Sequence, residues 1–180
     1  MTMRIALLRG VNVGGNKKVP MAELKAMIEG LGFTAVKTLL QSGNVVFRAG
    51  KQTDSGLEAL LEAETEKRLG LTTKYIVRAP AEWRAMIDAN PMPEEAGREP
   101  SRFLVNVARE TVTADQLAAI RAVATPGEKV EAVDRVVYIF FGDGIADSKA
   151  ALVFGRKSLG LTATGRNWNT VLKIAGLLEG

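Results

Sequence analysis

The stretch from Arg9 to Pro20, RGVNVGGNKKVP, holds the residues whose types and spacing best suit chemistry. It places three glycines, two asparagines, two lysines and an arginine within ten positions. Glycines allow backbone N–H groups to approach a ligand closely, and cationic side chains attract negative charge. The stretch also precedes a helical pattern, and a helix N-terminus carries partial positive charge. These features predict a binding site for an anion.

Two other stretches carry amide and cationic groups beside turns. The sequence QSGN at 41–44 joins two expected strands, and RNWN at 166–169 precedes a C-terminal helical pattern. The predicted ligand-binding residues are Arg9, Gly10, Asn12, Gly14, Gly15, Asn16, Lys17, Lys18, Gln41, Ser42, Gly43, Asn44, Arg166, Asn167, Trp168 and Asn169. Each stretch also has a plainer interpretation. The stretch 9–20 can be a tight crossover with solvated lysines, and 41–44 an ordinary hairpin turn. The stretch 166–169 can be a core tryptophan beside a surface arginine.

Missing residue types exclude much chemistry. The chain has no cysteine and no histidine, which removes thiol nucleophiles, disulfides, imidazole bases and zinc held by sulfur or imidazole. Asn16 stands where a P-loop requires lysine, and the three stretches contain no Asp or Glu. We therefore expect no metal site, and no particular cofactor is indicated. Catalysis here would depend on electrostatic stabilisation by Arg9, Lys17 or Lys18.

Composition indicates an ordinary globular protein. The chain of 180 residues is 47% hydrophobic and 24% charged, with a net charge of +4. Residues 1–52 carry eight Lys/Arg against two Asp/Glu, so the positive charge concentrates around the glycine-rich loop. No apolar run approaches the roughly 18 residues that a membrane span needs. The apolar stretch IALL near the N-terminus is too short for a secretory signal, so we expect a cytoplasmic protein without membrane contact.

The first half of the chain alternates between strand and helix patterns. We expect strands over 3–9, 34–40, 44–49 and 72–78, with helices over 20–31 and from 54 onward. This βαββαβ order predicts a ferredoxin-like motif with the antiparallel strand order 4-1-3-2. In that topology the loop at 10–19 and the turn at 41–44 meet at one edge of the sheet. They would then form one site with the N-terminus of the first helix.

The second half repeats the pattern less clearly. We expect a helix over 80–89, followed by a proline- and glutamate-rich boundary over 90–100. After this boundary we expect a strand over 101–109, a helix capped by Thr113 and Gln116, and a hairpin over 129–141. A helix over 145–154 and a C-terminal helix complete the expected elements. The predicted fold is α+β, with two ferredoxin-like subdomains built on antiparallel sheets, the second degenerate. The predicted divisions are 1–79, a linking helix and loop over 80–100, and 101–180.

Three long stretches also resemble a known bacterial family. The sequences LLRGVNVGGNKKVPMAELKAMIEGLGF, TLLQSGNVVF and TGRNWNTVLKI resemble the domain of unknown function 1697, whose members carry LLRGINVGG, QSGNVVF and RNWNT. This chain differs at Leu39, where members often carry Tyr. The resemblance implies a pair of ferredoxin-like subdomains and no assigned activity.

Three hypotheses of function remain open. The first is a protein that binds a small anionic ligand, phosphate- or nucleotide-like, at the basic edge. The second is a transferase-type enzyme acting on a phosphorylated or carboxylated metabolite. The third is a nucleic-acid- or protein-binding adaptor, which the basic N-terminal segment favours. The sequence specifies neither the ligand nor the oligomeric state.

Overall fold

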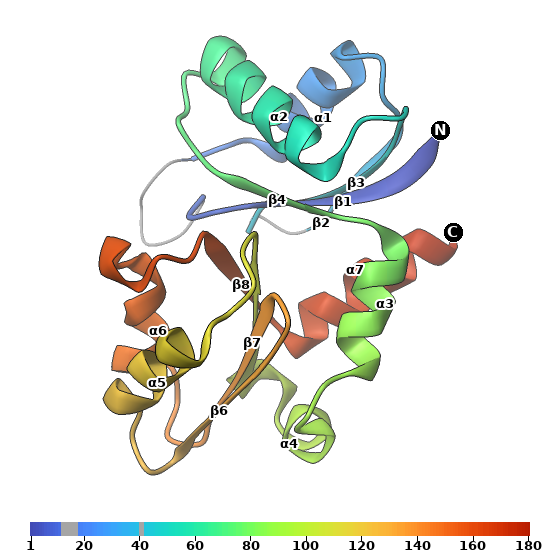
Figure 1. Cartoon of the computed structure of the whole chain (residues 1–180). Helices are drawn as coiled ribbons and strands as arrows, with labels where there is room; N and C mark the ends of the chain where they lie inside the picture. Colours follow the sequence, from blue (N-terminus) through green and yellow to red (C-terminus); the bar gives the residue numbers. More distant parts are fainter. Residues whose placement is uncertain (12–17, 40–41) are drawn as a thin grey trace. The chain divides into compact units, whose positions relative to one another are not determined.

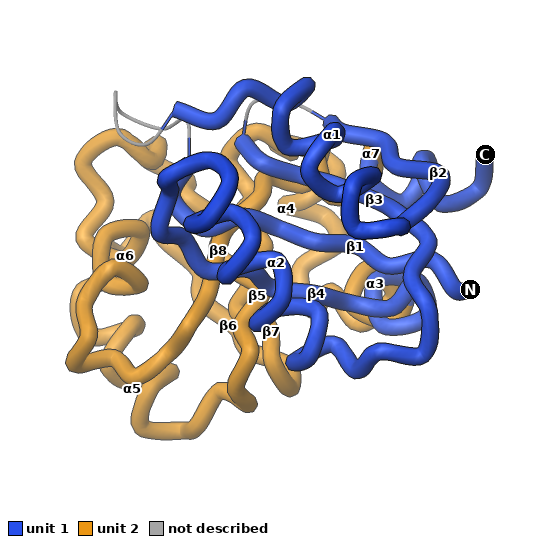
Figure 2. The backbone as a smooth tube through the Cα atoms, turned by 90° about the horizontal axis from the view of Figure 1, so that it is seen from above, with its two compact units in different colours: residues 1–84, 174–180 blue, residues 85–173 orange. Residues whose placement is uncertain are grey.

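The computed structural model describes residues 1–11, 18–39 and 42–180, which form two compact units. Unit 1 comprises residues 1–84 and 174–180, and unit 2 comprises residues 85–173 (Figure 2). Helices α3 (Pro80–Asp88) and α7 (Trp168–Glu179) contribute residues to both units. The division at 80–100 that we drew from the sequence stays a prediction.

Unit 1 contains a four-stranded antiparallel sheet in the order β2-β3-β1-β4. Its elements are β1 (Thr2–Leu8), α1 (Met21–Gly30), β2 (Thr34–Leu39), β3 (Asn44–Ala49), α2 (Asp54–Leu69) and β4 (Tyr75–Arg78). Helices α1 and α2 lie over one face of the sheet (Figure 1). Leu24 and Ile28 of α1 and Leu57 of α2 belong to the same buried cluster as Phe47 and Val77. The expected βαββαβ order and strand order are confirmed.

Local signals explain where the elements of unit 1 begin and end. Thr53 Oγ1 accepts a hydrogen bond from Gly56 N at 3.1 Å and so caps α2. The helix ends at Gly70, whose φ of 64° is left-handed and suits glycine. Strand β2 is irregular, because its register with β3 shifts between Thr34 and Lys37 and Ala35 has a φ of 52°. Such an irregularity is typical of a bulged edge strand.

Unit 2 repeats this topology. Its sheet has the order β6-β7-β5-β8, which matches the unit 1 order position by position. Its elements are β5 (Phe103–Ala108), α5 (Ala114–Val123), β6 (Glu128–Val133), β7 (Val136–Phe141), α6 (Lys149–Leu152) and β8 (Ala163–Asn167). Ile120 of α5 and Ala150 of α6 share a buried cluster with Ile139 and Phe141 of β7. Two ferredoxin-like subdomains are therefore confirmed, and the second is reduced because α6 has only four residues.

Three stretches differ from the expectations. The boundary expected over 90–100 contains a helix, α4 (Pro93–Arg98), because proline is tolerated in the first helical turn. The helix expected over 145–154 begins only at Lys149, where Ser148 Oγ accepts from Ala151 N at 3.2 Å. Strand β4 begins at Tyr75 instead of Thr72, because the Thr73 hydroxyl donates to Arg9 O at 2.8 Å.

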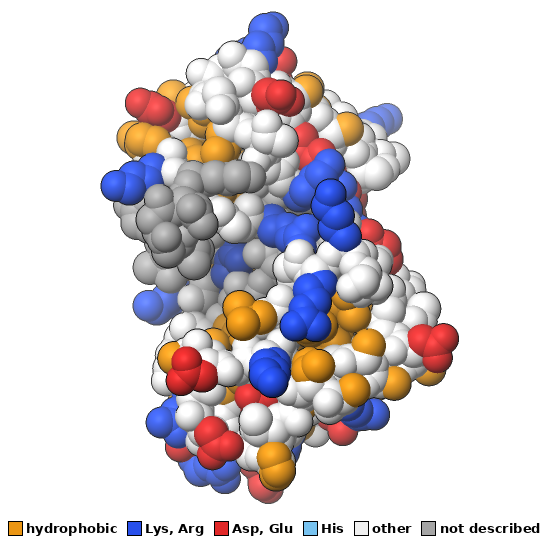
Figure 3. Space-filling view, turned by 90° about the vertical axis from the view of Figure 1, so that its left-hand side faces the viewer, with side chains coloured by type: hydrophobic (Ala, Val, Ile, Leu, Met, Phe, Trp, Pro, Cys, Tyr) orange, Lys and Arg blue, Asp and Glu red, His pale blue; other side chains and the backbone are white. Residues whose placement is uncertain are grey.

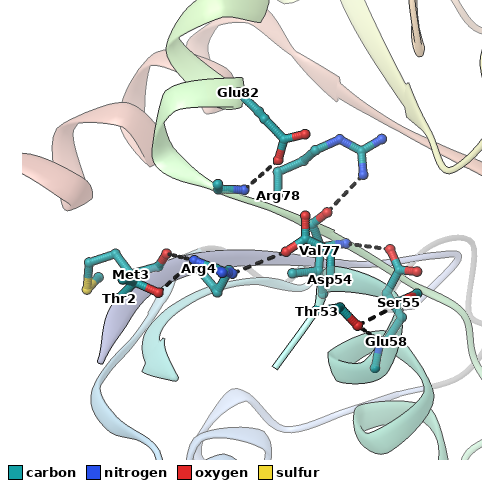
Figure 4. A network of polar contacts seen from close by, with 12 residues as sticks. Thr2, Met3, Arg4, Thr53, Asp54, Ser55, Glu58, Val77, Arg78 and Glu82 are labelled. Atoms are coloured by element: carbon teal, nitrogen blue, oxygen red, sulfur yellow. Dashed lines mark hydrogen bonds and ion pairs between the residues drawn. The ribbon is translucent and has the colours of Figure 1, made fainter. Parts of the chain in front are cut away.

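Strand β4 lies at the edge of the unit 1 sheet, and carboxylates of α2 accept from its outward N–H groups. Glu58 Oε1 accepts from Val77 N at 2.9 Å, a contact visible in Figure 4. Glu62 Oε1 accepts from Tyr75 N at 3.1 Å. Glu58 and Glu62 reach the same strand because residues four apart share one face of a helix. These bonds replace the strand pairing that an edge lacks.

A second group of contacts in Figure 4 holds the ends of β1 and β4. Arg4 Nε lies 3.1 Å from Asp54 Oδ1, an ion pair without hydrogen-bond alignment that joins β1 to the first turn of α2. After β4, Glu82 Oε2 accepts from Ala79 N at 2.9 Å. This is the back-bonding half of a capping box, and it explains why α3 begins at Pro80.

We expect Glu58→Ala to lower the free energy of unfolding by about 1–3 kcal/mol, because the buried Val77 N–H loses its acceptor. Urea-induced unfolding measures this change. Glu66→Ala, at an exposed position of the same helix, is the matched control and should stay within about 0.5 kcal/mol of the parent protein. Equal effects of the two substitutions would contradict the stabilising role of Glu58.

Both tyrosines of the chain, Tyr75 and Tyr138, are fully buried. Tyr75 Oη lies 2.7 Å from Thr65 Oγ1, and Tyr138 Oη donates to Met86 O at 2.5 Å. Burial raises the pKa of Tyr75 to about 12 and the pKa of Tyr138 to about 12, because a buried phenolate loses its hydration.

The folded protein should therefore ionise its tyrosines at higher pH than the unfolded chain, in which the pKa is about 10. Between these values the folded state binds more protons, so the free energy of unfolding falls as the pH rises through this window. At about pH 11, tyrosinate absorbance should report roughly a tenth of the tyrosine ionised in native protein and roughly nine tenths in urea. Native protein that ionises both tyrosines near pH 10 would contradict this prediction.

Candidate functional site

Arg9 and Gly10 lie directly after β1, which is one of the two inner strands of the unit 1 sheet. The backbone of Arg9 is held on both sides, since its N–H donates to Lys74 O at 2.9 Å and its carbonyl accepts from Thr73 Oγ1 at 2.8 Å. Gly10 has a φ of 65°, a left-handed conformation that turns the chain away from the strand. The Arg9 side chain therefore starts from a fixed backbone at the end of the sheet.

The β2–β3 turn lies beside the end of β1. Leu8 N donates to Gly43 O at 2.9 Å, and the Cα register pairs Leu7 with Asn44. Asn44 is 1% exposed, and its Nδ2 donates to Leu39 O and Ser42 Oγ, both at 2.9 Å. Both amide hydrogens of Asn44 are thus used within the turn. Asn44 shapes this turn, and its predicted contact with a ligand stays a prediction.

In the described part of the chain, the residue at the N-cap position of helix α1 provides no side-chain cap. Pro20 occupies the N-cap position and its side chain has no acceptor for a cap hydrogen bond, whereas Thr53, Thr113 and Asn167 cap α2, α5 and α7 through their side chains. Lys18, which is exposed, lies two residues before Pro20. The first turn of α1 thus presents backbone N–H groups that no side chain of the cap position satisfies. Such a helix start can accept an anion.

Part of the predicted site lies outside the described residues. These residues are Asn12, Gly14, Gly15, Asn16, Lys17 and Gln41. The structure places Arg9, Gly10, Ser42, Gly43 and Asn44 around the same end of the unit 1 sheet.

Arg166 lies in β8 of unit 2 and is 6% exposed. Its Nη1 donates to Thr164 Oγ1 at 2.7 Å and to Gly165 O at 2.8 Å. Burial lowers the pKa of Arg166 to about 10, because the guanidinium loses hydration. The interpretation of Arg166 as a solvated surface charge is therefore wrong. Its predicted role as a ligand residue stays a prediction.

The three residues after Arg166 form the start of α7. Asn167 Oδ1 accepts from Thr170 N at 3.0 Å and so caps the helix. Trp168 is half-buried and packs edge-on against Phe103, with ring centroids 5.6 Å apart. Asn169 is exposed. Asn167 therefore stabilises the start of α7, and Trp168 packs against Phe103. Their contact with a ligand stays a prediction.

Sequence reasoning missed Thr73 and Lys74, which hold the backbone of Arg9. The signal that could have found them is the strand order, because β4 pairs with β1 and its first residues must lie beside the last residues of β1. Among the residues that the structure describes, no three Asp or Glu side chains form a group that could hold a metal ion. Within the same residues, no helix has the length and apolar character of a membrane span.

We expect Gly43→Ala to destabilise the protein by more than its backbone conformation alone explains. At a φ of 82°, an added Cβ would lie 2.7 Å from Val11 Cγ2 and 2.9 Å from Leu8 Cβ. Gly70→Ala is the matched control, since Gly70 has a φ of 64° and open space at that position. Urea unfolding should show a loss of about 1–2 kcal/mol for Gly70→Ala. Gly43→Ala should lose about 1–3 kcal/mol more, and equal losses would contradict close packing at the turn.

Comparisons with known proteins place the chain in a family. Residues 1–138 match the family described as "Protein of unknown function (DUF1697)". None of the curated proteins matches the chain significantly. Among solved structures, the conserved bacterial protein SP0830 from Streptococcus pneumoniae is similar to this chain, with 23% sequence identity, 98% of each chain covered and a TM-score of 0.71. This similarity shows that the two proteins share a fold. The chain belongs to the DUF1697 family of proteins of unknown function.

Proposed function

We propose that this protein binds a small anionic ligand, phosphate- or nucleotide-like, at the end of the unit 1 sheet where Arg9 follows β1. The observation that carries the proposal is the fixed backbone of Arg9, which is bound by Thr73 and Lys74 beside the β2–β3 turn. An anchored arginine loses less conformational freedom when it binds an anion than one on a mobile segment. It can also bind phosphate oxygens through two N–H groups at once.

The charge around this end of the sheet supports an anionic ligand. Residues 1–52 carry eight Lys/Arg against two Asp/Glu; of the described cations, Arg9 and the exposed Lys18 belong to the proposed site, whereas Arg48 and Lys51 lie at the other end of β3. Lys and Arg side chains are prominent among those exposed on the side drawn in Figure 3. A positive field of this kind attracts anions to the site.

The N-terminus of α1 should contribute less to the affinity for an anion than the Arg9 side chain. Glu23 already lies in the first turn of α1, where its carboxylate interacts with the helix dipole and opposes a second negative charge. A helix terminus stabilises an exposed anion by about 0.3–1 kcal/mol, whereas a hydrogen bond to a charged group contributes about 1.5–3 kcal/mol. Arg9 is therefore the residue on which affinity should depend most.

We expect Arg9→Gln to weaken the binding of pyrophosphate by about tenfold or more, because one charge-assisted hydrogen bond is lost. Isothermal titration calorimetry at low salt measures the dissociation constant. Lys51→Gln is the matched control, since Lys51 is exposed and follows β3 at the other end of that strand. Circular dichroism confirms that each variant is folded. Equal affinity of the parent protein and both variants would contradict the proposal.

The same samples distinguish binding from catalysis. After incubation with nucleoside triphosphates, phosphorus NMR detects any transfer or release of a phosphoryl group. Product formation that disappears in Arg9→Gln would favour the transferase-type enzyme. Binding without product supports a ligand-binding protein.

A further inference from the structure

Unit 2 contains an open groove of about 1040 Å³, separate from the residues discussed so far. It is lined by residues 91–95, which include the start of α4, by residues 124–126 after α5, by residues 128–131 of β6, and by Arg121. Its volume lies just above the roughly 300–1,000 Å³ typical of pockets for drug-sized ligands. The groove therefore has room for several residues of a peptide.

The apolar part of the groove is rigid. Pro91, Pro93 and Pro126 line it, and the proline ring fixes the backbone φ angle. Met92 lies between two of these prolines and is 7% exposed, so its side chain is held by packing. A preformed surface of this kind binds a partner at a lower cost in conformational entropy than a mobile one.

The backbone of β6 favours recognition of side chains over the addition of a strand. Gly142 N donates to Gly127 O at 3.0 Å, and this bond fixes which residues of β6 bond to β7. The backbone N–H and C=O groups of the alternate residues, including Glu128 and Val130, therefore point away from β7. Arg121 Nε and Nη2 donate to Val130 O at 3.0 and 2.9 Å, and Glu128 N donates to Thr125 O at 3.0 Å. Val130 O and Glu128 N are therefore occupied, which leaves less of this edge for an added strand and favours recognition of an incoming segment through its side chains.

The groove is acidic in a protein that is basic overall. Its lining carries the carboxylates of Glu94, Glu95, Glu128 and Glu131 against the cations of Arg121 and Lys129, whereas the whole chain has a net charge of +4. Both cations are already paired, since Arg121 Nη2 lies 3.0 Å from Glu131 Oε2 and Lys129 Nζ lies 2.5 Å from Glu95 Oε1. An incoming ligand therefore meets an excess of carboxylates, which complements a cationic partner.

The pair of Lys129 and Glu95 marks the place for a ligand cation. Lys129 extends from β6 to α4, and its side chain is 59% exposed while that of Glu95 is only 14% exposed. The hydrogen bond from Lys129 lowers the pKa of Glu95, so this carboxylate stays ionised. An exposed ammonium in an ion pair contributes little to stability, so a ligand ammonium or guanidinium can replace it at small cost.

We propose that this groove binds an extended, cationic peptide segment of a partner protein, with a Lys or Arg side chain at Glu95 in place of Lys129 and apolar side chains against Met92 and the prolines. The proposal is independent of anion binding in unit 1. It makes Glu95 the main anchoring residue and Lys129 an intramolecular competitor. The two residues should therefore affect affinity in opposite directions.

Fluorescence anisotropy with the labelled peptide LKPLKPLK tests the proposal, with LEPLEPLE as the acidic counterpart. We expect the lysine peptide to bind and the acidic peptide not to bind. Glu95→Gln should weaken the binding of the lysine peptide by about two- to fivefold, because the ligand ammonium loses its ion pair at this exposed position. Lys129→Met should strengthen the binding of the lysine peptide by about two- to fivefold, because it removes the competing ammonium and an exposed ion pair contributes an energy of that size.

The control variants are Glu66→Gln and Lys67→Met, which remove one negative and one positive charge at exposed positions of α2 in unit 1. They should leave the affinity unchanged. No binding of LKPLKPLK to either the parent protein or Lys129→Met overturns the proposal, and so does weaker binding by Lys129→Met. Displacement of the peptide by an equimolar trivalent polyamine would overturn the peptide assignment, since charge alone would then suffice.

Discussion

The pairing of β1 with a neighbour on each side is the constraint on which the candidate site depends. Strand β3 pairs with β1 from Thr2 to Leu7, and β4 pairs with it from Ile5 to Leu8. A central strand bonded along both edges cannot slide or rotate, because a shift of one residue would turn its buried side chains to the opposite face. The residues that follow β1 therefore inherit a fixed position. The backbone of Arg9 is fixed most directly, since the pairing continues through the hydrogen bond from its N–H to Lys74 O.

Much of the fold follows from local patterns in the sequence. The spacing of Leu24, Met27 and Ile28 predicts α1, and the strand order of both sheets follows from the βαββαβ succession. Helix α4 was missed because the prolines of the 90–100 stretch indicate a break, although the first helical turn tolerates Pro93. The length of α6 was overestimated at both ends, because the helix begins only after its cap at Ser148 and the apolar residues past Leu152 fold as a short 3₁₀ turn.

The candidate site was less predictable, because its contacts join residues far apart in the chain. The bond between Thr73 and Arg9 spans 64 residues, and no local pattern marks either partner for it. Asn44 illustrates the opposite difficulty, since an asparagine in a turn suits ligand binding and backbone bonding equally. Only the side-chain orientation shows that both of its amide hydrogens are used within the turn. Residue types thus predict which groups are available, and the geometry decides how each one is used.

The two edges of the unit 1 sheet have a consequence for the protein at high concentration. An edge strand with unpaired N–H groups is a template on which another chain can form a strand, and aggregation often begins there. On β4, Glu58 and Glu62 occupy the N–H groups of Val77 and Tyr75. On β2, the register shift and the left-handed Ala35 interrupt the regular spacing that a second chain would need. This sheet therefore offers a poor template for intermolecular β-pairing, and the protein should resist assembly into fibres through it.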